Sequence, residues 1–269
     1  MAGGAGRAEP MWLTYLREQY AVAAEEAEIY PYSAADLLRA DSADAVLKVQ
    51  AAQLGQPGER VVGMLFAKRY SVLIMGVLSA LSLFDRMPEI RPDKVRFRVT
   101  HEAEMAYMLE GASLVAEEAP AAGEERARRA KRHRERLLAE HIGPVFAAVA
   151  DRTGIRPGPM WSLLSTNIQN MYARLQHDPS LPLSRERREI VEADRAALLD
   201  RSLRVVPGFD RNPLAVRLRT FSHPSYEGLP IFLRNACCLA YLLTEDGEPH
   251  GYCATCPKAT PEERLAKLV

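Results

Sequence analysis

The four cysteines of this 269-residue chain all lie near its C-terminus, at positions 237, 238, 253 and 256. Cys237 and Cys238 are adjacent, whereas Cys253 and Cys256 form a Cys-x-x-Cys pair that Pro257 follows directly. Dispersed cysteines would serve as small apolar core residues, but this clustering indicates one shared purpose. The C-terminal segment must therefore fold so that these sulfurs come together.

Charge and hydropathy limit the classes of partner and the location. The chain has 35 basic and 35 acidic residues, so nothing general favours binding to nucleic acid or to an anionic membrane. Residues 1–10 lack the apolar core of a signal peptide, so we expect a flexible tail and a cytoplasmic protein. In the reducing cytoplasm, clustered cysteines are metal ligands or redox groups more often than disulfides. The longest apolar run, Val72–Phe84, is shorter than the roughly 20 residues that span a bilayer, which predicts a buried helix and no integral membrane segment.

The first ninety residues are predicted to be mainly helical. Apolar residues recur there at helical spacing, and Ser33 and Ser42 stand where N-caps would precede short helices. Residues Lys94–Thr100 then alternate between polar and apolar side chains, which is typical of a half-buried strand, and Met105–Leu109 is its expected partner.

The second half of the chain is predicted to consist of helices and a terminal region of loops. Helices are expected over 157–176, which begins at Pro157, and over 184–200, which Ser184 would cap. After Pro207 loops dominate, and Cys238–Leu243 is predicted to be a strand that leads into a turn at Asp246-Gly247.

These patterns favour an α+β fold, with a predominantly helical body, a few antiparallel strands and a C-terminal cysteine-rich segment that binds a cluster. The predicted organisation is a tail over 1–10, a helical part with a short sheet over 11–118, a second helical part over 124–206, and the cluster-binding segment over 207–269. An Ala/Pro/Gly linker at 119–123 separates the two helical parts.

The cysteine spacing favours a two-iron cluster over a single zinc ion. Structural zinc sites with four cysteines usually have two Cys-x-x-Cys pairs, because two intervening residues let both sulfurs reach one metal. Here only Cys253 and Cys256 have that spacing. Adjacent residues in a strand point to opposite faces, so Cys237 and Cys238 could serve one small centre only if the backbone kinks. A 2Fe-2S cluster is broader and takes four thiolates, and a proline after the last ligand is found in ferredoxin-type sequences.

Other interpretations of the cysteines remain open at this point. Zinc could still occupy all four positions. A disulfide between Cys237 and Cys238 beside a Cys-x-x-Cys dithiol would indicate a thiol oxidoreductase or a redox sensor. The four cysteines could also be buried without any ligand.

The cysteine arrangement resembles that of the bacterial ferric-siderophore reductases of the FhuF-like type. The likeness lies in the Cys-Cys pair, a spacer and a Cys-x-x-Cys-Pro at the C-terminus, preceded by Arg234 and a short apolar segment. It covers Phe232–Pro257, and Trp161–Asn167 also looks like a Trp- and Asn-bearing helix of these proteins. The spacer Leu239–Tyr252 is longer here than is usual in that family.

The resemblance implies a cytoplasmic oxidoreductase for iron acquisition. A 2Fe-2S cluster bound by Cys237, Cys238, Cys253 and Cys256 would pass one electron to chelated Fe(III), with no side chain acting as nucleophile or general base. The partners would be a ferric siderophore and an electron donor, such as a ferredoxin or an NAD(P)H-dependent reductase. Relatives of the helical body occur in siderophore synthetases, but the absence of a Gly-rich phosphate loop disfavours a synthetase.

Residues near the ligands are candidates for substrate contact and for tuning the reduction potential. Arg234, Tyr252 and Lys258 are the candidates for substrate binding, and Arg234 and Lys258 would raise the potential if they lie close to the sulfurs. The basic run Arg126–Arg136 is interpreted as a solvated helix face, with docking of an acidic siderophore or donor protein as the alternative. The alternative function is a non-redox zinc-binding or siderophore-handling module.

Overall fold

The computed structural model describes residues 9–23, 29–100, 104–110, 117–118, 123–245 and 248–268. Most of the predicted tail over 1–10 therefore lies outside the described residues. The helices are α1 (Met11–Tyr20), α2 (Ala40–Gln53), α3 (Glu59–Phe84), α4 (Gly123–Arg136), α5 (Gly143–Thr153), α6 (Pro157–His177), α7 (Arg185–Leu198) and α8 (Pro261–Leu265). Short 3-10 turns are η1 (Ala34–Leu38), η2 (Pro92–Lys94) and η5 (Ala240–Leu242), and η4 (Leu137–Ile142) is a π-helical turn. The strands are β1 (Val22–Ala23), β2 (Tyr32–Ser33), β3 (Arg86–Met87), β4 (Val95–Val99), β5 (Met105–Leu109), β6 (Glu117–Glu118), β7 (Arg219–Thr220), β8 (Phe232–Leu233), β9 (Thr244–Glu245) and β10 (Glu248–Pro249).

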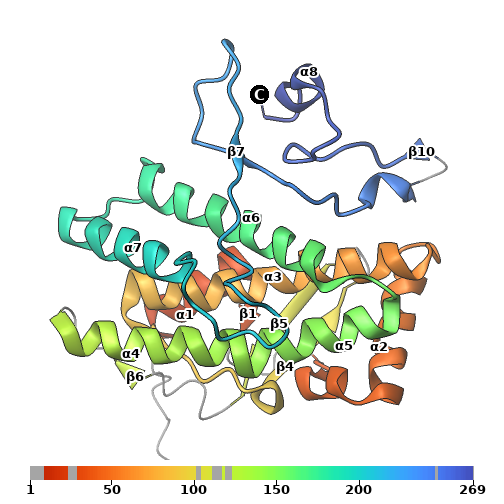
Figure 1. The fold of residues 1–269 in the computed structure, drawn as a ribbon, viewed down its shortest axis with the longest axis horizontal. Coiled ribbons are helices and arrows are strands. Elements are labelled where there is room, and N and C mark those ends of the chain that lie inside the picture. The colour runs from red at the N-terminus through yellow and green to blue at the C-terminus, as the bar shows by residue number, and fades with distance from the viewer. Residues whose placement is uncertain are drawn as a thin grey trace, which may run out of the picture.

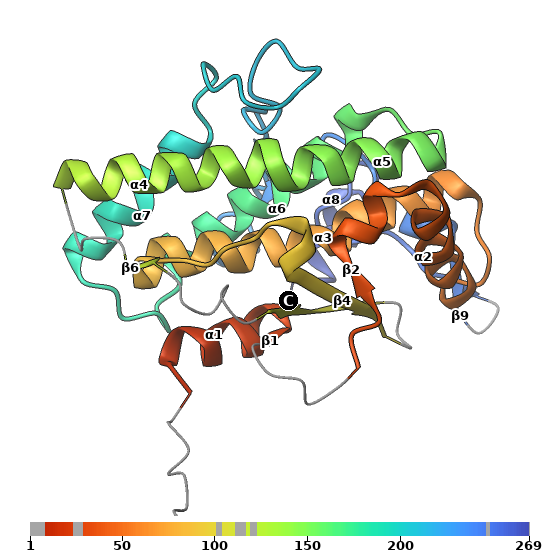
Figure 2. The same cartoon turned by 90° about the horizontal axis from the view of Figure 1, so that it is seen from below.

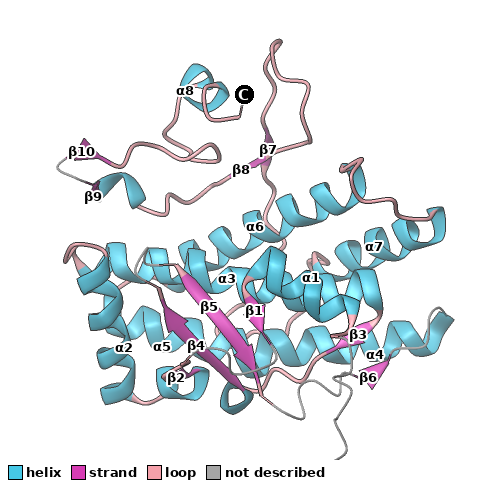
Figure 3. Cartoon of the chain, turned by 180° about the vertical axis from the view of Figure 1, so that it is seen from behind, coloured by secondary structure: helices cyan, strands magenta, loops and turns pink. Residues whose placement is uncertain are grey.

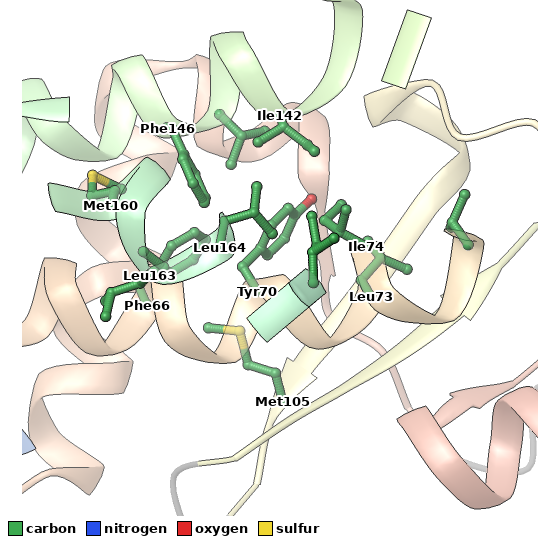
Figure 4. Packing of buried hydrophobic residues seen from close by; sticks show 14 of the residues in the cluster. Phe66, Tyr70, Leu73, Ile74, Met105, Ile142, Phe146, Met160, Leu163 and Leu164 are labelled. Atoms are coloured by element: carbon green, nitrogen blue, oxygen red, sulfur yellow. The ribbon is translucent and has the colours of Figure 1, made fainter. Parts of the chain in front are cut away.

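The long helix α3 lies at the centre of the body (Figure 1). It is apolar on all sides, and helices α1, α2, α5, α6 and α7 all pack against it. Figure 4 shows how its side chains interlock with those of the neighbouring elements, with these residues labelled: Phe66, Tyr70, Leu73, Ile74, Met105, Ile142, Phe146, Met160, Leu163 and Leu164. A helix that is apolar all round must be enclosed, because any exposed face would leave apolar area in water.

Burial of α3 confirms the prediction of a buried helix at Val72–Phe84, although the helix begins much earlier, at Glu59. Among the described helices, α3 alone has the length and apolar composition to cross a membrane. Of its most apolar window, 83% is buried inside the protein, which is the behaviour of a core helix.

A small sheet covers one face of α3, as the view from behind shows (Figure 3). The strand order is β1-β5-β4-β2, and β4 pairs antiparallel with β5 in a register that places Val95 opposite Leu109. This confirms the strand pair expected at Lys94–Thr100 and Met105–Leu109. All five residues of β5 are buried, because strands flank it on both sides and α3 packs against it. The α+β class is confirmed, and one pairing, β1 with β5, is parallel.

Two of the three predicted N-caps, Ser33 and Ser184, were confirmed, and the third, Ser42, was not. Ser33 caps η1 in a capping box, in which its side chain accepts from Ala35 N and Asp36 accepts from Ser33 N. Ser184 caps α7 by accepting from Arg187 N. The prediction at Ser42 was wrong, since α2 begins at Ala40 and Ser42 lies within its first turn.

The basic helix α4 is not a wholly solvated face, and the interpretation of Arg126–Arg136 is corrected in this respect. Arg126 and Arg134 are buried and reach across to carboxylates on the neighbouring elements. Arg126 donates to Asp85 at 2.6 Å and to Asp194 at 2.8 Å, and Arg134 donates to Asp194 at 3.0 Å. These ion pairs join α4 to α7 and to the end of α3, where a charge without a partner would be costly.

α4 continues through the π-turn η4 into α5, so that the three form one rod along the body (Figure 2). A side chain at Gly143 would meet the Leu138 carbonyl at 2.9 Å, so the junction accepts only glycine. Within η4, buried His141 lies between the Tyr70 hydroxyl, 2.8 Å from its Nε2, and the Ile90 carbonyl at its Nδ1. Burial lowers the pKa of His141 to about 4, so the ring is neutral and Tyr70 donates to it.

One continuous hydrophobic cluster includes Trp12, Leu138 and Cys238, which belong to the three predicted parts of the chain. After α7 the chain is mostly loop, and the segment that holds β8, η5, β9, β10 and α8 lies over α3 and α6 (Figure 1). The division at 118, 124 and 207 stays a prediction. The geometry places the cysteine segment and α4 on opposite sides of the body (Figure 1).

Replacement of Asp194 by alanine tests whether the buried ion pairs hold α4 in place. Asp194→Ala leaves Arg126 and Arg134 buried without this carboxylate, and we expect a loss of about 3–5 kcal/mol in the free energy of unfolding. Urea denaturation followed by circular dichroism measures it. Glu192→Ala on the same helix removes an exposed pair with Arg195 and should change little. Equal stability of the two variants would contradict this assignment.

Candidate metal centre

Helix α6 holds the cysteine segment through polar side chains on the face that meets it. Asn170 donates from its Nδ2 to the Phe232 carbonyl at 3.0 Å, and its Oδ1 accepts from the Phe232 amide at 2.7 Å. Gln169, the residue before Asn170, and Ser165, about one turn before Gln169, donate to the carbonyls of Val216 and Leu214. The backbone two residues before Arg234 is therefore fixed to the rigid core.

Backbone hydrogen bonds bring the two cysteine pairs together. The Arg234 amide donates to the Thr255 carbonyl at 3.0 Å, which joins the chain before Cys237 to the Cys-x-x-Cys loop. The Cys256 amide donates to the Cys253 carbonyl at 2.8 Å and closes that loop as a tight turn.

The backbone kinks directly after Cys238, as one shared site for adjacent cysteines requires. Leu239 has φ 64°, in the left-handed region, and its amide lies 3.4 Å from the Cys237 sulfur. The strand predicted over Cys238–Leu243 was wrong, because this left-handed residue ends the extended backbone and the 3-10 turn η5 follows. Strands β9 and β10 pair on either side of Asp246-Gly247, which lies outside the described residues.

The four sulfurs are arranged as two pairs, and all four cysteines are free. The Sγ atoms of Cys237 and Cys256 are 3.9 Å apart, and the thiol of Cys253 donates a hydrogen bond to Cys238. Two thiolates on one tetrahedral metal, each about 2.3 Å from it, would be about 3.8 Å apart. Within the described ranges, no three His, Cys, Asp or Glu side chains gather where they could hold one metal ion.

Arg234 lies against one of the two pairs. Its side chain is buried, with 6% of the residue exposed, and its Nη1 lies 3.1 Å from the sulfur of Cys238 and 3.1 Å from that of Cys253. The hydrogen bond from Cys253, together with the charge of Arg234, lowers the pKa of Cys238 to about 5, and the same bond raises the pKa of Cys253. Without metal, the charge of Arg234 therefore favours a thiolate in this pair.

The centre also receives charge from the body of the protein. Lys68 and Arg69, on α3, lie close enough to Cys238 to interact with it electrostatically, and Lys68 acts on Cys253 as well. Arg69 is buried, with 8% exposed, and its Nη1 finds no hydrogen-bond partner among the described residues. Sequence reasoning missed these two residues, since they belong to an apolar helix far from the cysteines in the chain.

An aromatic and basic rim lies beside Cys237 at the surface. The exposed Lys258 places its Nζ 2.6 Å from the Tyr241 hydroxyl and 4.1 Å from the centre of that ring. The rings of Tyr241 and Tyr252 are 5.3 Å apart, and Lys258 interacts electrostatically with Cys237. Two of the three residues predicted to bind substrate, Tyr252 and Lys258, thus lie together at this rim, whereas Arg234 lies inside.

Arg264 braces the Cys-x-x-Cys loop, and no sequence motif pointed to it. Its guanidinium donates to the carbonyls of Ala254 and Cys256, both at 2.7 Å. Helix α8 presents this arginine after a capping box formed by Thr260 and Glu263. An arginine in a short charged helix has no sequence signal that separates such a role from a surface position.

A comparison with known protein families finds a match in the helical body of the chain. The model of a family described as "Ferric iron reductase FhuF-like transporter" matches residues 65–225, which is more than half of the chain. The match runs from α3 to just beyond β7 and ends before the first cysteine. None of the curated proteins matches the chain.

Replacement of Asn170 tests whether α6 positions the cysteine segment. Asn170→Ala removes two hydrogen bonds to Phe232, each worth about 0.5–1.5 kcal/mol, so local opening should become about tenfold more frequent. Amide hydrogen exchange, measured by mass spectrometry, should accelerate over 232–256.

The matched control for this prediction is Asn167→Ala, one turn earlier on α6. The Asn167 side chain bonds Ser71 within the body, so exchange over 232–256 should not change. Equal acceleration in both variants would mean that Asn170 does not anchor the segment.

Proposed function

Because the chain belongs to the family of FhuF-like ferric iron reductases, we propose that it transfers one electron to siderophore-bound Fe(III) through a 2Fe-2S cluster held by its four cysteines. The observation that carries this proposal is the pairing of Cys237 with Cys256 and of Cys238 with Cys253. Four thiols in two pairs suit two adjacent irons, each with two protein sulfurs. They suit a single zinc ion less well, since zinc needs all four donors around one point.

When bound, the cluster supplies a one-electron couple, with a net charge of about −2 when oxidised and about −3 when reduced. The protein must stabilise this charge at a partly buried position. Arg234 donates directly to two of the sulfurs, and Lys68 and Arg69 add positive charge from α3. These cations favour the more negative, reduced form.

The substrate is proposed to be Fe(III) held by the hard oxygen donors of a siderophore. Such donors prefer the small trivalent ion, so the gain of one electron weakens the complex and releases Fe(II). The electron comes from a reduced donor, such as a ferredoxin or an NAD(P)H-dependent reductase, which leaves oxidised. No proton transfer or nucleophile is required, so the protein needs only to dock the chelate and set the potential.

The rim of Tyr241, Tyr252 and Lys258 is the proposed docking surface for the chelate. Lys258 interacts electrostatically with half-buried Cys237, a proposed ligand, so a chelate placed at this rim would be close to the centre. Lys258 offers a positive charge to an anionic chelate, and the two rings offer flat apolar contact. The buried position of Arg234 favours a tuning role over substrate contact.

The basic face of α4 is a poorer docking surface for an acidic siderophore or a donor protein. Arg126 and Arg134 are already paired with Asp194. A cavity of about 230 Å³ lies between α4 and residues 87–91, but α4 is on the opposite side of the body from the cysteine segment (Figure 1). The cytoplasm, where imported siderophores would be reduced, is the proposed location.

Absorption spectroscopy on protein purified without oxygen tests the cluster. We expect a coloured protein that bleaches with dithionite and contains about two irons and two acid-labile sulfides per chain. Cys238→Ser should lose or shift the spectrum, because a hydroxyl is a poor ligand for this iron. Ala254→Ser, in the same loop, adds a hydroxyl without removing a sulfur and should keep the spectrum.

Two outcomes would contradict the proposed cluster or its proposed ligands. Colourless protein with one zinc per chain and no dithionite response would select the non-redox zinc module instead. An unchanged spectrum in Cys238→Ser would remove Cys238 from the ligands.

Steady-state reduction of an anionic ferric siderophore tests the docking rim. Lys258→Ala should raise KM about three- to tenfold and leave kcat nearly unchanged, because an exposed charge acts on encounter and binding. Lys131→Ala, an exposed lysine of α4, is the matched control and should not alter KM. A larger KM for Lys131→Ala than for Lys258→Ala would move the docking site to the basic face of α4.

A further inference from the structure

We propose that Arg234 is a positioning residue that makes the two sulfur pairs unequal, so that the added electron resides at the pair formed by Cys238 and Cys253. Its Nη1 lies 3.1 Å from each of these two sulfurs. The other pair, Cys237 and Cys256, receives no contact from this guanidinium; Cys237 has a backbone amide, that of Leu239, at 3.4 Å. The inference rests on the proposed function, since it assigns a role toward the cluster.

Burial by itself does not favour extra negative charge at Cys238 and Cys253. Each pair has one buried residue, Cys238 or Cys256, and one half-buried residue, Cys253 or Cys237. Cys238 and Cys253 also pack against the main hydrophobic cluster, so desolvation opposes added charge at their pair at least as strongly as at the other. The difference between them must come from the charges and the donors placed around each pair.

The charge of Arg234 acts on the sulfurs without compensation. Its side chain is buried, and among the described residues its guanidinium donates to the two sulfurs and to no carboxylate. Its Nε is buried and has no hydrogen-bond partner among the described residues, so the guanidinium is held by the sulfurs and by packing. A guanidinium keeps its proton at any working pH, so its charge is permanent.

Two cations of the body reinforce the same pair. Lys68 interacts electrostatically with both Cys238 and Cys253, and Arg69 interacts with Cys238. On the other side, Lys258 interacts with Cys237, but its ammonium is exposed and water screens it. Arg264 is buried near Cys256, but its guanidinium donates to the carbonyls of Ala254 and Cys256 and not to a sulfur. The positive potential is therefore higher at Cys238 and Cys253, which is where additional negative charge is best stabilised.

The reduction potential of Arg234 variants tests this inference. In Arg234→Gln the charge is lost, and the equilibrium constant for one-electron reduction should fall at least tenfold, which is about 59 mV. Arg234→Lys keeps a charge, but its shorter side chain does not place a donor where Nη1 lies between the two sulfurs, so its potential should lie between those of the wild-type protein and Arg234→Gln. Spectroelectrochemical titration of full-length protein with matched iron and sulfide content measures these shifts.

Arg219→Gln is the matched control, because Arg219 is an exposed arginine of β7 in the same segment. Its potential should equal that of the wild-type protein. Mössbauer spectra of the ⁵⁷Fe-loaded protein give a second readout. In the oxidised protein, where both irons are ferric, the two irons should be distinct in the wild type and more alike in Arg234→Gln.

The failure of this inference and the failure of the proposed function give different results. Wild-type protein without a 2Fe-2S spectrum would overturn the proposed function and, with it, the premise. A normal cluster in Arg234→Gln with an unchanged potential would overturn the role of Arg234 alone. If Arg234→Gln does not retain the cluster, the reduction potential of Arg234→Lys provides the test. A potential equal to that of the wild-type protein would then overturn the inference.

Discussion

The need to enclose an apolar helix on every side determines the architecture of this protein. α3 has 26 residues and offers no polar face to water, so helices α1, α2, α5, α6 and α7 and the small sheet are arranged around it. At its end, Asp85 accepts hydrogen bonds from Arg126 and Arg187. The same helix thus anchors the apolar core and, through its last turn, the buried ion pairs that attach α4.

The cysteine segment depends on this body, because it has little core of its own. Its described elements are two-residue strands, one 3-10 turn and a short helix, which cannot bury enough apolar surface to be stable alone. Asn170 of α6 and the packing of Cys238 into the main cluster attach it. Metal binding would add a cross-link between its two halves, so folding of the segment and loading are expected to be coupled.

Features that depend on neighbours in the chain could be predicted from local patterns, whereas features that depend on long-range contacts could not. The alternation at Lys94–Thr100 and the cap at Ser184 were confirmed, because each depends on neighbours in the chain. The burial of Arg126 could not be predicted, since its partners Asp85 and Asp194 are far away in sequence. The clustering of the four cysteines was evident from the sequence, whereas the left-handed conformation of Leu239 was not, because nothing in a leucine signals a positive φ.

The cations around the sulfurs divide into two sets that differ in how water affects them. Arg234 is buried against two sulfurs, so its effect on them is strong and nearly independent of salt. Lys258 is exposed, so salt would weaken its attraction for an anionic chelate. In the proposed function, tuning of the potential and docking of the substrate would therefore fall to different residues. A mutation at Lys258 would then change docking and leave the potential nearly unchanged, whereas a mutation at Arg234 would do the reverse.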